Sequence, residues 1–223
     1  ENESMTIQDR EDFLIDLNKG IKGKKIAIPH NFGTRVVDKE VFEIFNSNIK
    51  LFEKLGANLE EIKFDFDLND FEQPFHKCLM HTFSFCVNEQ FYNVDPKKLM
   101  PHVKNTIERG KKVMASDYAK ALAQLSEYRF KMDNIFSKFD YIVSPTVAIP
   151  PHKCNERPNI INGKIDISSI DDKEMFEEND YDYSSWIFVL AQFTAPFNWS
   201  GNPAVSLPCG FTKNGLPIGL QLA

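Results

Sequence analysis

Glycine and proline recur at short intervals between apolar runs in residues 193–222, the last quarter of the chain. Each proline fixes one backbone dihedral angle and removes a hydrogen-bond donor, and each glycine tolerates conformations that other residues avoid. Glycine and proline at these positions restrict the backbone conformation more tightly than ordinary core packing requires. The pattern therefore predicts short apolar strands that are separated by defined turns.

The spacing of these residues forms one long pattern. It consists of Asn, two residues, Gly, one residue and Pro, then an apolar strand, Pro-x-Gly-Phe and Gly-x-Pro-x-Gly-x-Gln. The residues that carry it are Asn198, Gly201, Pro203, Pro208, Gly210, Phe211, Gly215, Pro217, Gly219 and Gln221. The pattern resembles the closing segment of the amidase signature family, a family of serine amide hydrolases. The resemblance implies an α/β fold that has a mixed central β-sheet with helices on both faces.

A strand, a helix and a second strand are predicted within residues 24–64. The helix begins after Asp38, a candidate N-cap, and ends before Gly56. Apolar residues at helical spacing define its buried face, namely Val41, Phe42, Phe45, Ile49 and Phe52. This order of elements predicts two parallel strands joined by a covering helix. The segment Leu55–Glu60 also resembles the family at the exit from this helix.

Two further helical regions are predicted in the middle of the chain. Residues 70–92 carry aromatic residues on more than one face, which is typical of a buried helix. A long helix is predicted from an N-cap at Ser116 to about Lys138. Its expected buried stripe contains Tyr118, Leu122, Leu125, Met132 and Phe136. Asp140–Thr146 is predicted as a strand, and its Pro-Thr ending also resembles the family.

Residues 147–182 show no sustained periodicity and are rich in Pro, Asn, Asp and Ser. A segment of this length without a regular pattern is typical of a functional loop or lid, or of a poorly ordered segment. We expect it to cover a substrate entrance. The chain starts without Met and stops inside an expected strand, so we interpret residues 1–223 as a single incomplete domain, the C-terminal portion of an amidase domain.

The resemblance also implies a chemistry. Enzymes of this family use a Lys, a Ser in a cis peptide and a nucleophilic Ser, and the two serines lie in a Gly/Ser-rich segment that stabilises the oxyanion. The adjacent serine pairs here, Ser168-Ser169 and Ser184-Ser185, have no flanking glycine. We therefore assign no catalytic residue to this chain. The parent protein is expected to hydrolyse carboxylic amides through an acyl-serine intermediate, without a metal or organic cofactor.

Four residues are candidates for substrate binding. Arg129 falls in the apolar stripe of the long helix, where a guanidinium must find an acceptor. That acceptor is either a substrate carboxylate or an internal acidic residue. Phe193, Asn198 and Trp199 lie in or beside the Asn-x-x-Gly turn, and their aromatic rings would serve a substrate channel or the core equally well.

Composition limits the partners. The net charge is −6, and no long Lys/Arg cluster is present, which argues against direct nucleic-acid binding. The apolar runs are too short for a membrane span, and the histidine spacings do not indicate a metal site. We expect a cytoplasmic protein whose partners are a small amide substrate and the N-terminal half of the same protein, and the sequence leaves room for a homodimer.

Two alternatives to a simple amidase stay open. The first is the A subunit of glutamyl-tRNA amidotransferase. Relatives that act on glutamine carry an acidic residue two positions before the Phe-Thr pair, where this chain has Ala191. The second alternative is a non-catalytic relative of the amidase fold that acts as a binding or assembly module.

Overall fold

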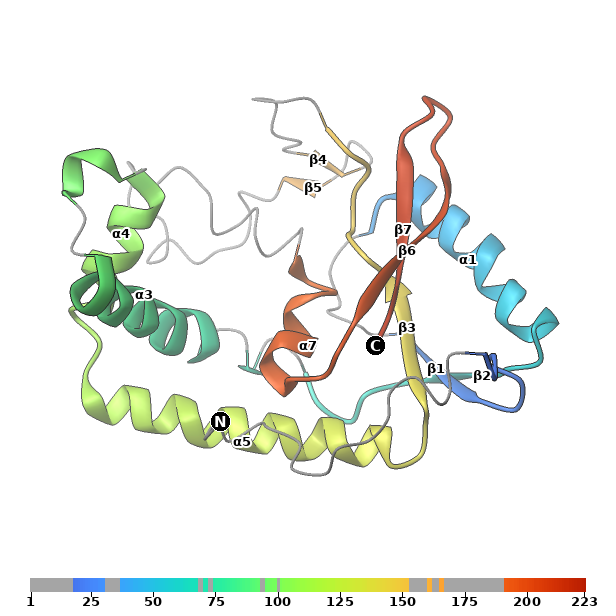
Figure 1. Cartoon of the computed structure of the whole chain (residues 1–223), viewed down its shortest axis with the longest axis horizontal. Helices are drawn as coiled ribbons and strands as arrows, with labels where there is room; N and C mark the ends of the chain where they lie inside the picture. Colours follow the sequence, from blue (N-terminus) through green and yellow to red (C-terminus); the bar gives the residue numbers. More distant parts are fainter. Residues whose placement is uncertain are drawn as a thin grey trace.

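A computed structural model describes residues 18–30, 37–67, 70–71, 74–92, 95–99, 101–152, 160–161, 165–166 and 191–223. Its main feature is a five-stranded sheet in the order β2-β1-β3-β7-β6 (Figure 1). The strands are β1 (Lys25–Pro29), β2 (Asn58–Ile62), β3 (Tyr141–Pro145), β6 (Val205–Phe211) and β7 (Pro217–Leu222). β1 pairs in parallel with β2 and β3, whereas β7 is antiparallel to β3 and β6. The predicted mixed sheet is confirmed.

Helix α1 (Lys39–Lys54) connects β1 to β2, as the sequence predicts. Its N-cap is Asp38, whose carboxylate accepts hydrogen bonds from the backbone N–H groups of Glu40 and Val41 at 2.8 and 3.3 Å. These bonds satisfy donors that have no partner inside the helix. One detail of the predicted stripe is wrong. Phe42 is 53% exposed, because the buried stripe of α1 is narrower than the run of apolar residues.

Helices cover both faces of the sheet. Ile26, Val143 and Leu220 face α1 and pack with Phe45 and Ile49 of that helix. The alternate strand residues Ala27 and Ile142 face the other way, into a larger core. That core contains residues of α5 (Ala115–Phe136) and α7 (Ala195–Ser200). The two-residue period of the strands thus separates two apolar layers, and the expected α/β arrangement is confirmed.

The long helix α5 runs along the bottom of the view in Figure 1 and differs in detail from the prediction. It begins at Ala115 after Met114, so Ser116 lies in its first turn and is not the N-cap. Its buried residues are Ala121, Tyr128 and Met132, whereas Tyr118 and Leu122 are 36% and 43% exposed. The buried stripe of α5 contains the small residue Ala121. A prediction from the largest apolar residues therefore identifies a neighbouring face at the N-terminal end of the helix.

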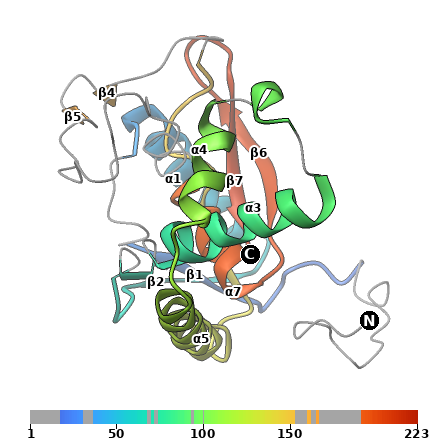
Figure 2. The same cartoon turned by 90° about the vertical axis from the view of Figure 1, so that its left-hand side faces the viewer.

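Residues 74–92 are helical, as predicted, and further helical segments follow them. The described residues between 74 and 110 form two π-helical turns, a 3₁₀ turn and two α-helices, namely η1 (Pro74–Met80), α3 (His81–Val87), η2 (Asn88–Tyr92), η3 (Pro96–Lys98) and α4 (Pro101–Gly110). Figure 2 shows α3 and α4 together in front of the sheet. The expected burial of this region is not found in α3, which has no buried residue and exposes 63% of Phe83.

Two short strands lie within the predicted 147–182 loop. They are β4 (Ile160–Ile161) and β5 (Ile165–Asp166), and they pair antiparallel. Most of the loop lies outside the described residues, and so do Ser168-Ser169 and Ser184-Ser185. The expectation that this loop covers a substrate entrance therefore stays a prediction.

Hydrogen bonds to Asp140 connect the beginning of β1 to the beginning of β3. Its carboxylate accepts hydrogen bonds from Lys24 Nζ and from the backbone N–H of Lys25, both at 2.8 Å. The bond from Lys24, followed by the bond from Lys25, lowers the pKa of Asp140 below its usual value. The carboxylate therefore stabilises the fold at neutral pH, and this contribution is lost as the pH falls through the lowered pKa.

Candidate functional site

The Asn-x-x-Gly part of the closing pattern forms the end of a helix. α7 begins after Thr194, and its C-cap is Gly201, whose φ of 82° places it in the left-handed region that favours glycine. The N–H of Gly201 donates to the carbonyl oxygen of Phe197 at 2.8 Å. The predicted turn is therefore the C-terminal cap of a short helix, and Asn198 lies on the exposed side of that helix.

The later glycine of the pattern, Gly219, lies at a close contact between strands. Thr146 Oγ1 and Ser206 Oγ form a hydrogen bond of 2.7 Å, and Gly219 faces this pair. A Cβ atom at position 219 would approach the two hydroxyl oxygens to 2.8 and 2.7 Å. The glycine is therefore required by the approach of side chains from β6 and from the residue after β3.

The last residue of the pattern, Gln221, makes a buried hydrogen-bond network. Its Nε2 donates to the carbonyl oxygen of Phe193 at 2.7 Å and to Ser144 Oγ at 3.2 Å. Only 4% of Gln221 is exposed. This side chain links β7 to β3 and to the segment that leads into α7.

The aromatic candidates belong to a packed cluster between α5, α7 and the segment after β2. The ring of Trp199 meets Tyr128 edge to face, with centroids 5.7 Å apart. Tyr128 also contacts Phe66 and Phe71, and Phe193 belongs to the same apolar core. The structure thus brings Phe193 and Trp199 into one core, which favours the packing interpretation for the rings themselves.

Arg129 contacts the same helix end. Its Nε donates to the carbonyl oxygen of Trp199 at 3.1 Å, and the side chain is half-buried. The carbonyl groups at the C-terminal end of a helix lack intrahelical donors and carry partial negative charge, so a guanidinium is well placed there. This acceptor is neither of the two predicted from the sequence. The bond joins two of the four candidate residues directly.

Tyr128 is a feature of this region that the sequence analysis missed. It is fully buried, and its hydroxyl has no hydrogen-bond partner within the described residues. Burial raises the pKa of Tyr128 above its usual value, so the phenol is neutral. Its place four residues before Met132, on the buried side of α5, is the signal that could have identified it.

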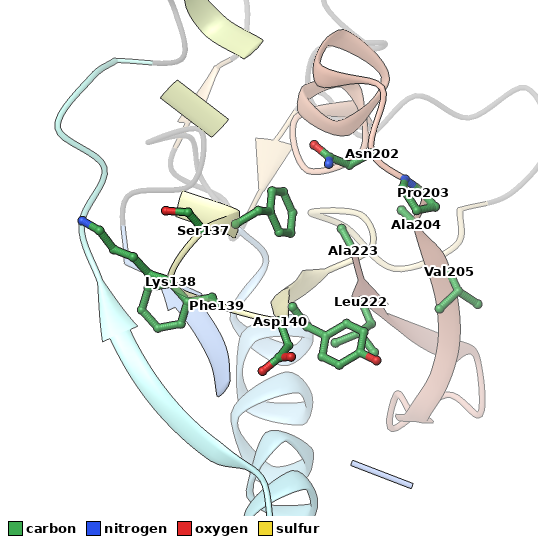
Figure 3. Close-up of a pocket in the computed structure, with 12 residues that line it drawn as sticks. Ser137, Lys138, Phe139, Asp140, Asn202, Pro203, Ala204, Val205, Leu222 and Ala223 are labelled. Carbon is green, nitrogen blue, oxygen red and sulfur yellow. The ribbon is translucent and has the colours of Figure 1, made fainter. Parts of the chain in front are cut away.

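A cavity of about 720 Å³ opens at the end of the sheet where β3 begins and β7 ends (Figure 3). Its lining comes from residues 136–141, residues 202–205 and the chain end at Leu222 and Ala223. Apolar side chains dominate this lining, and the Asp140 carboxylate is already bonded to Lys24. None of the four candidate residues lines the cavity, which therefore does not coincide with the predicted binding site.

Two kinds of feature are absent from the described residues. No group of three or more His, Cys, Asp or Glu residues in this part of the chain could hold a metal ion. Among the helices described, none is both long and apolar enough to cross a membrane.

Two curated relatives carry the same name, the A subunit of glutamyl-tRNA(Gln) amidotransferase. The protein from Alkaliphilus metalliredigens is 28% identical over 237 residues, which cover 95% of this chain and 43% of the relative. The protein from Halothermothrix orenii is 27% identical, and the match covers 45% of the length of that relative. The chain thus spans less than half the length of these curated relatives.

Solved structures share the fold. A bacterial aryl acylamidase of the amidase signature enzymes superimposes with a TM-score of 0.71 at 20% identity, covering 97% of this chain and 43% of that one. The A subunit of glutamyl-tRNA(Gln) amidotransferase from Thermotoga maritima gives a TM-score of 0.62 at 23% identity, covering 100% and 43%. The protein-family model described as Amidase matches residues 2–223 of this chain. Since this match spans nearly the whole sequence, the chain belongs to the amidase signature family.

Proposed function

We propose that this chain is the scaffolding and substrate-binding part of a hydrolase that cleaves carboxylic amides through an acyl-serine intermediate. The nucleophilic serine and its lysine base would come from a Gly/Ser-rich segment outside residues 1–223. Family membership supports the reaction class. Two observations support the proposal that the catalytic residues come from another segment. The chain covers less than half the length of the curated relatives, and its sequence contains no Gly/Ser-rich segment.

The observation that carries this proposal is the difference between the two edges of the sheet. At the β6 edge, Val205, Leu207 and Phe211 are 49%, 40% and 68% exposed. The opposite edge strand, β2, presents polar residues such as Asn58 and Glu60. Charged side chains protect a sheet edge from further pairing, whereas an apolar edge is a template for another strand. We therefore assign the β6 edge to the catalytic segment.

Leu207→Lys is expected to weaken the association of this chain with a polypeptide that carries the Gly/Ser-rich segment by about tenfold or more. The lysine places a charge on the apolar edge where the added strand would pack, and burying an unpaired charge is costly. Asn58→Lys adds the same charge to the opposite edge and should leave the association unchanged. Calorimetric titration of the two purified polypeptides measures both effects.

The titration can also contradict the assignment. Equal affinities for the two lysine variants would exclude β6 as the docking edge. If the unmodified chain forms a homodimer that Leu207→Lys converts to a monomer, the edge instead binds a second copy of this chain. Size-exclusion chromatography with light scattering distinguishes that outcome.

We propose Arg129, Phe193, Asn198 and Trp199 as the substrate-binding residues of the assembled enzyme, in which Arg129 and Asn198 contact the substrate and the buried rings of Phe193 and Trp199 support them. The bond from Arg129 to the α7 carbonyl supports this grouping, because it places a cation beside the helix that carries Asn198 and Trp199 and that follows Phe193. The planar guanidinium matches the geometry of a carboxylate, which is the substrate group that Arg129 would bind. The substrate class would then be amides that also carry an acidic group.

Arg129→Ala in the assembled enzyme is expected to lower kcat/KM on acidic amides by about 10- to 100-fold, which is the effect of one charged hydrogen bond. Neutral amides should be hydrolysed at nearly the original rate. Lys120→Ala, an exposed change on the same helix, is the control. Equal losses on acidic and neutral amides, together with a lower Tm, would show that Arg129 only fastens α7.

A second candidate function is that of the A subunit of a glutamyl-tRNA amidotransferase, because the curated relatives carry this name. Ala191 argues against it, since the resemblance implies an acidic residue there in relatives that act on glutamine. Glutaminase assays of the assembled protein separate the two candidates. Hydrolysis of glutamine in preference to simple amides would favour the amidotransferase, and no hydrolysis of any amide would favour a non-catalytic module.

A further inference from the structure

The backbone that leads into α7 contains a carbonyl group that the helix cannot satisfy. Thr194 is the N-cap of α7, and Phe193 precedes it. The first carbonyl that accepts an intrahelical bond is that of the N-cap, so the carbonyl of Phe193 needs a donor from elsewhere. The residue is only 3% exposed. A buried carbonyl without a partner is costly, so the donor that it finds determines where this backbone lies.

Gln221 supplies that donor from β7. Its Nε2 lies 2.7 Å from the Phe193 oxygen, and its second bond, of 3.2 Å, goes to Ser144 Oγ. Ser144 is directly opposite Gln221 in the β3–β7 pairing, and only 3% of it is exposed. The amide group is thus fixed by the sheet on one side and holds the start of α7 on the other.

The choice of residue at this position is not explained by packing. Leu220, the neighbour of Gln221 in β7, faces α1 in an apolar layer. Gln221 faces the other layer, whose buried members include Ile142, Phe193 and Phe197. A buried amide in such surroundings is tolerated only where its hydrogen bonds are made. A leucine or methionine would fill the same space and would not supply the donor that now bonds the Phe193 carbonyl.

We propose that Gln221 is a positioning residue for the reaction: it fixes the backbone at Phe193 and thereby orients α7 with Asn198 and Trp199. The inference rests on the proposed function, in which Asn198, on the exposed side of this helix, contacts the amide substrate. The side chain of Gln221 bonds the Phe193 carbonyl and acts on the helix through it. Its effect on the reaction should therefore be a change in substrate binding.

The first experiment measures the backbone itself in the 223-residue chain. Amide hydrogen exchange is followed by mass spectrometry in Gln221→Met and in the control Leu220→Ala, which changes the same strand on the opposite face. Gln221→Met should accelerate exchange by about 10- to 100-fold within residues 194–201, because loss of one buried hydrogen bond favours local opening. Leu220→Ala should accelerate exchange near α1 instead. The same exchange pattern in both variants would overturn the inference.

The second experiment measures catalysis in the assembled enzyme. Gln221→Met should raise KM for the amide about tenfold and change kcat little, whereas Leu220→Ala should lower Tm without changing KM. An unchanged KM in Gln221→Met would overturn the positioning role. If the unmodified assembly hydrolyses no amide, the proposed function fails, and the exchange experiment still decides whether Gln221 holds the start of α7.

Discussion

Gly110→Ala is expected to destabilise the folded chain by about 3 kcal/mol, the upper part of the range for overpacking a close contact. Gly110 is the last residue of α4, where this helix meets α3. A Cβ atom there would overlap the backbone carbonyl of His81 and would lie 2.7 Å from Phe85 Cβ. Both obstacles belong to the backbone or lie next to it, so the two helices would have to separate.

Urea unfolding followed by circular dichroism measures this effect. Glu108→Ala, a change at a solvent-facing position of the same helix, is the control and should shift the free energy of unfolding by no more than about 0.5 kcal/mol. Midpoints that agree for Gly110→Ala and the unmodified chain would show that α3 and α4 do not make this close contact.

The closing pattern shows how far the sequence alone could predict the fold. Gly201 has a local cause, the left-handed cap of α7, and a local cause can be inferred from the spacing of glycine and proline. Gly219 has a distant cause, the hydroxyl pair formed by Thr146 and Ser206. The sequence therefore indicated that the backbone was constrained there, and only the structure shows which side chains impose the constraint.

Helix faces were harder to predict where the buried residues are small. The α1 stripe was predicted well, because Val41, Phe45 and Ile49 are large and regularly spaced. In α5 the stripe runs through Ala121, and the larger Leu122 beside it is 43% exposed. Side-chain size predicts burial only where every position of the stripe is large.

Hydrogen bonds to the backbone account for most of what the sequence could not predict about the candidate site. The carboxylate partner expected for Arg129 stays a prediction, and the structure adds a hydrogen bond to the carbonyl of Trp199 that the sequence did not indicate. Gln221 was recognised as part of the pattern, and its partner is the carbonyl of Phe193. Every residue carries a backbone carbonyl, so a sequence contains no signal for which one a side chain will bind.

The isolated chain is expected to have no amidase activity. Enzymes lower the reaction barrier by roughly 8 kcal/mol or more, and amide hydrolysis of this type requires an activated serine and preorganised N–H donors for the oxyanion. The candidate residues of this chain are a guanidinium, an amide and aromatic rings, none of which can serve as the acyl-accepting nucleophile. We therefore expect the chain to supply substrate contacts and a scaffold, and the Gly/Ser-rich segment to supply the bond-breaking step.

The proposal that the catalytic residues lie outside this chain is tested most directly by an activity assay. The purified 223-residue chain is incubated with a panel of aliphatic and aryl amides, and their hydrolysis is measured. The controls are two double variants, Ser168→Ala with Ser169→Ala and Ser184→Ala with Ser185→Ala. We expect no turnover by the chain alone, and we expect activity when it is produced together with a polypeptide that carries the Gly/Ser-rich segment. Turnover by the isolated chain that disappears in either double variant would show instead that the nucleophile lies within residues 1–223.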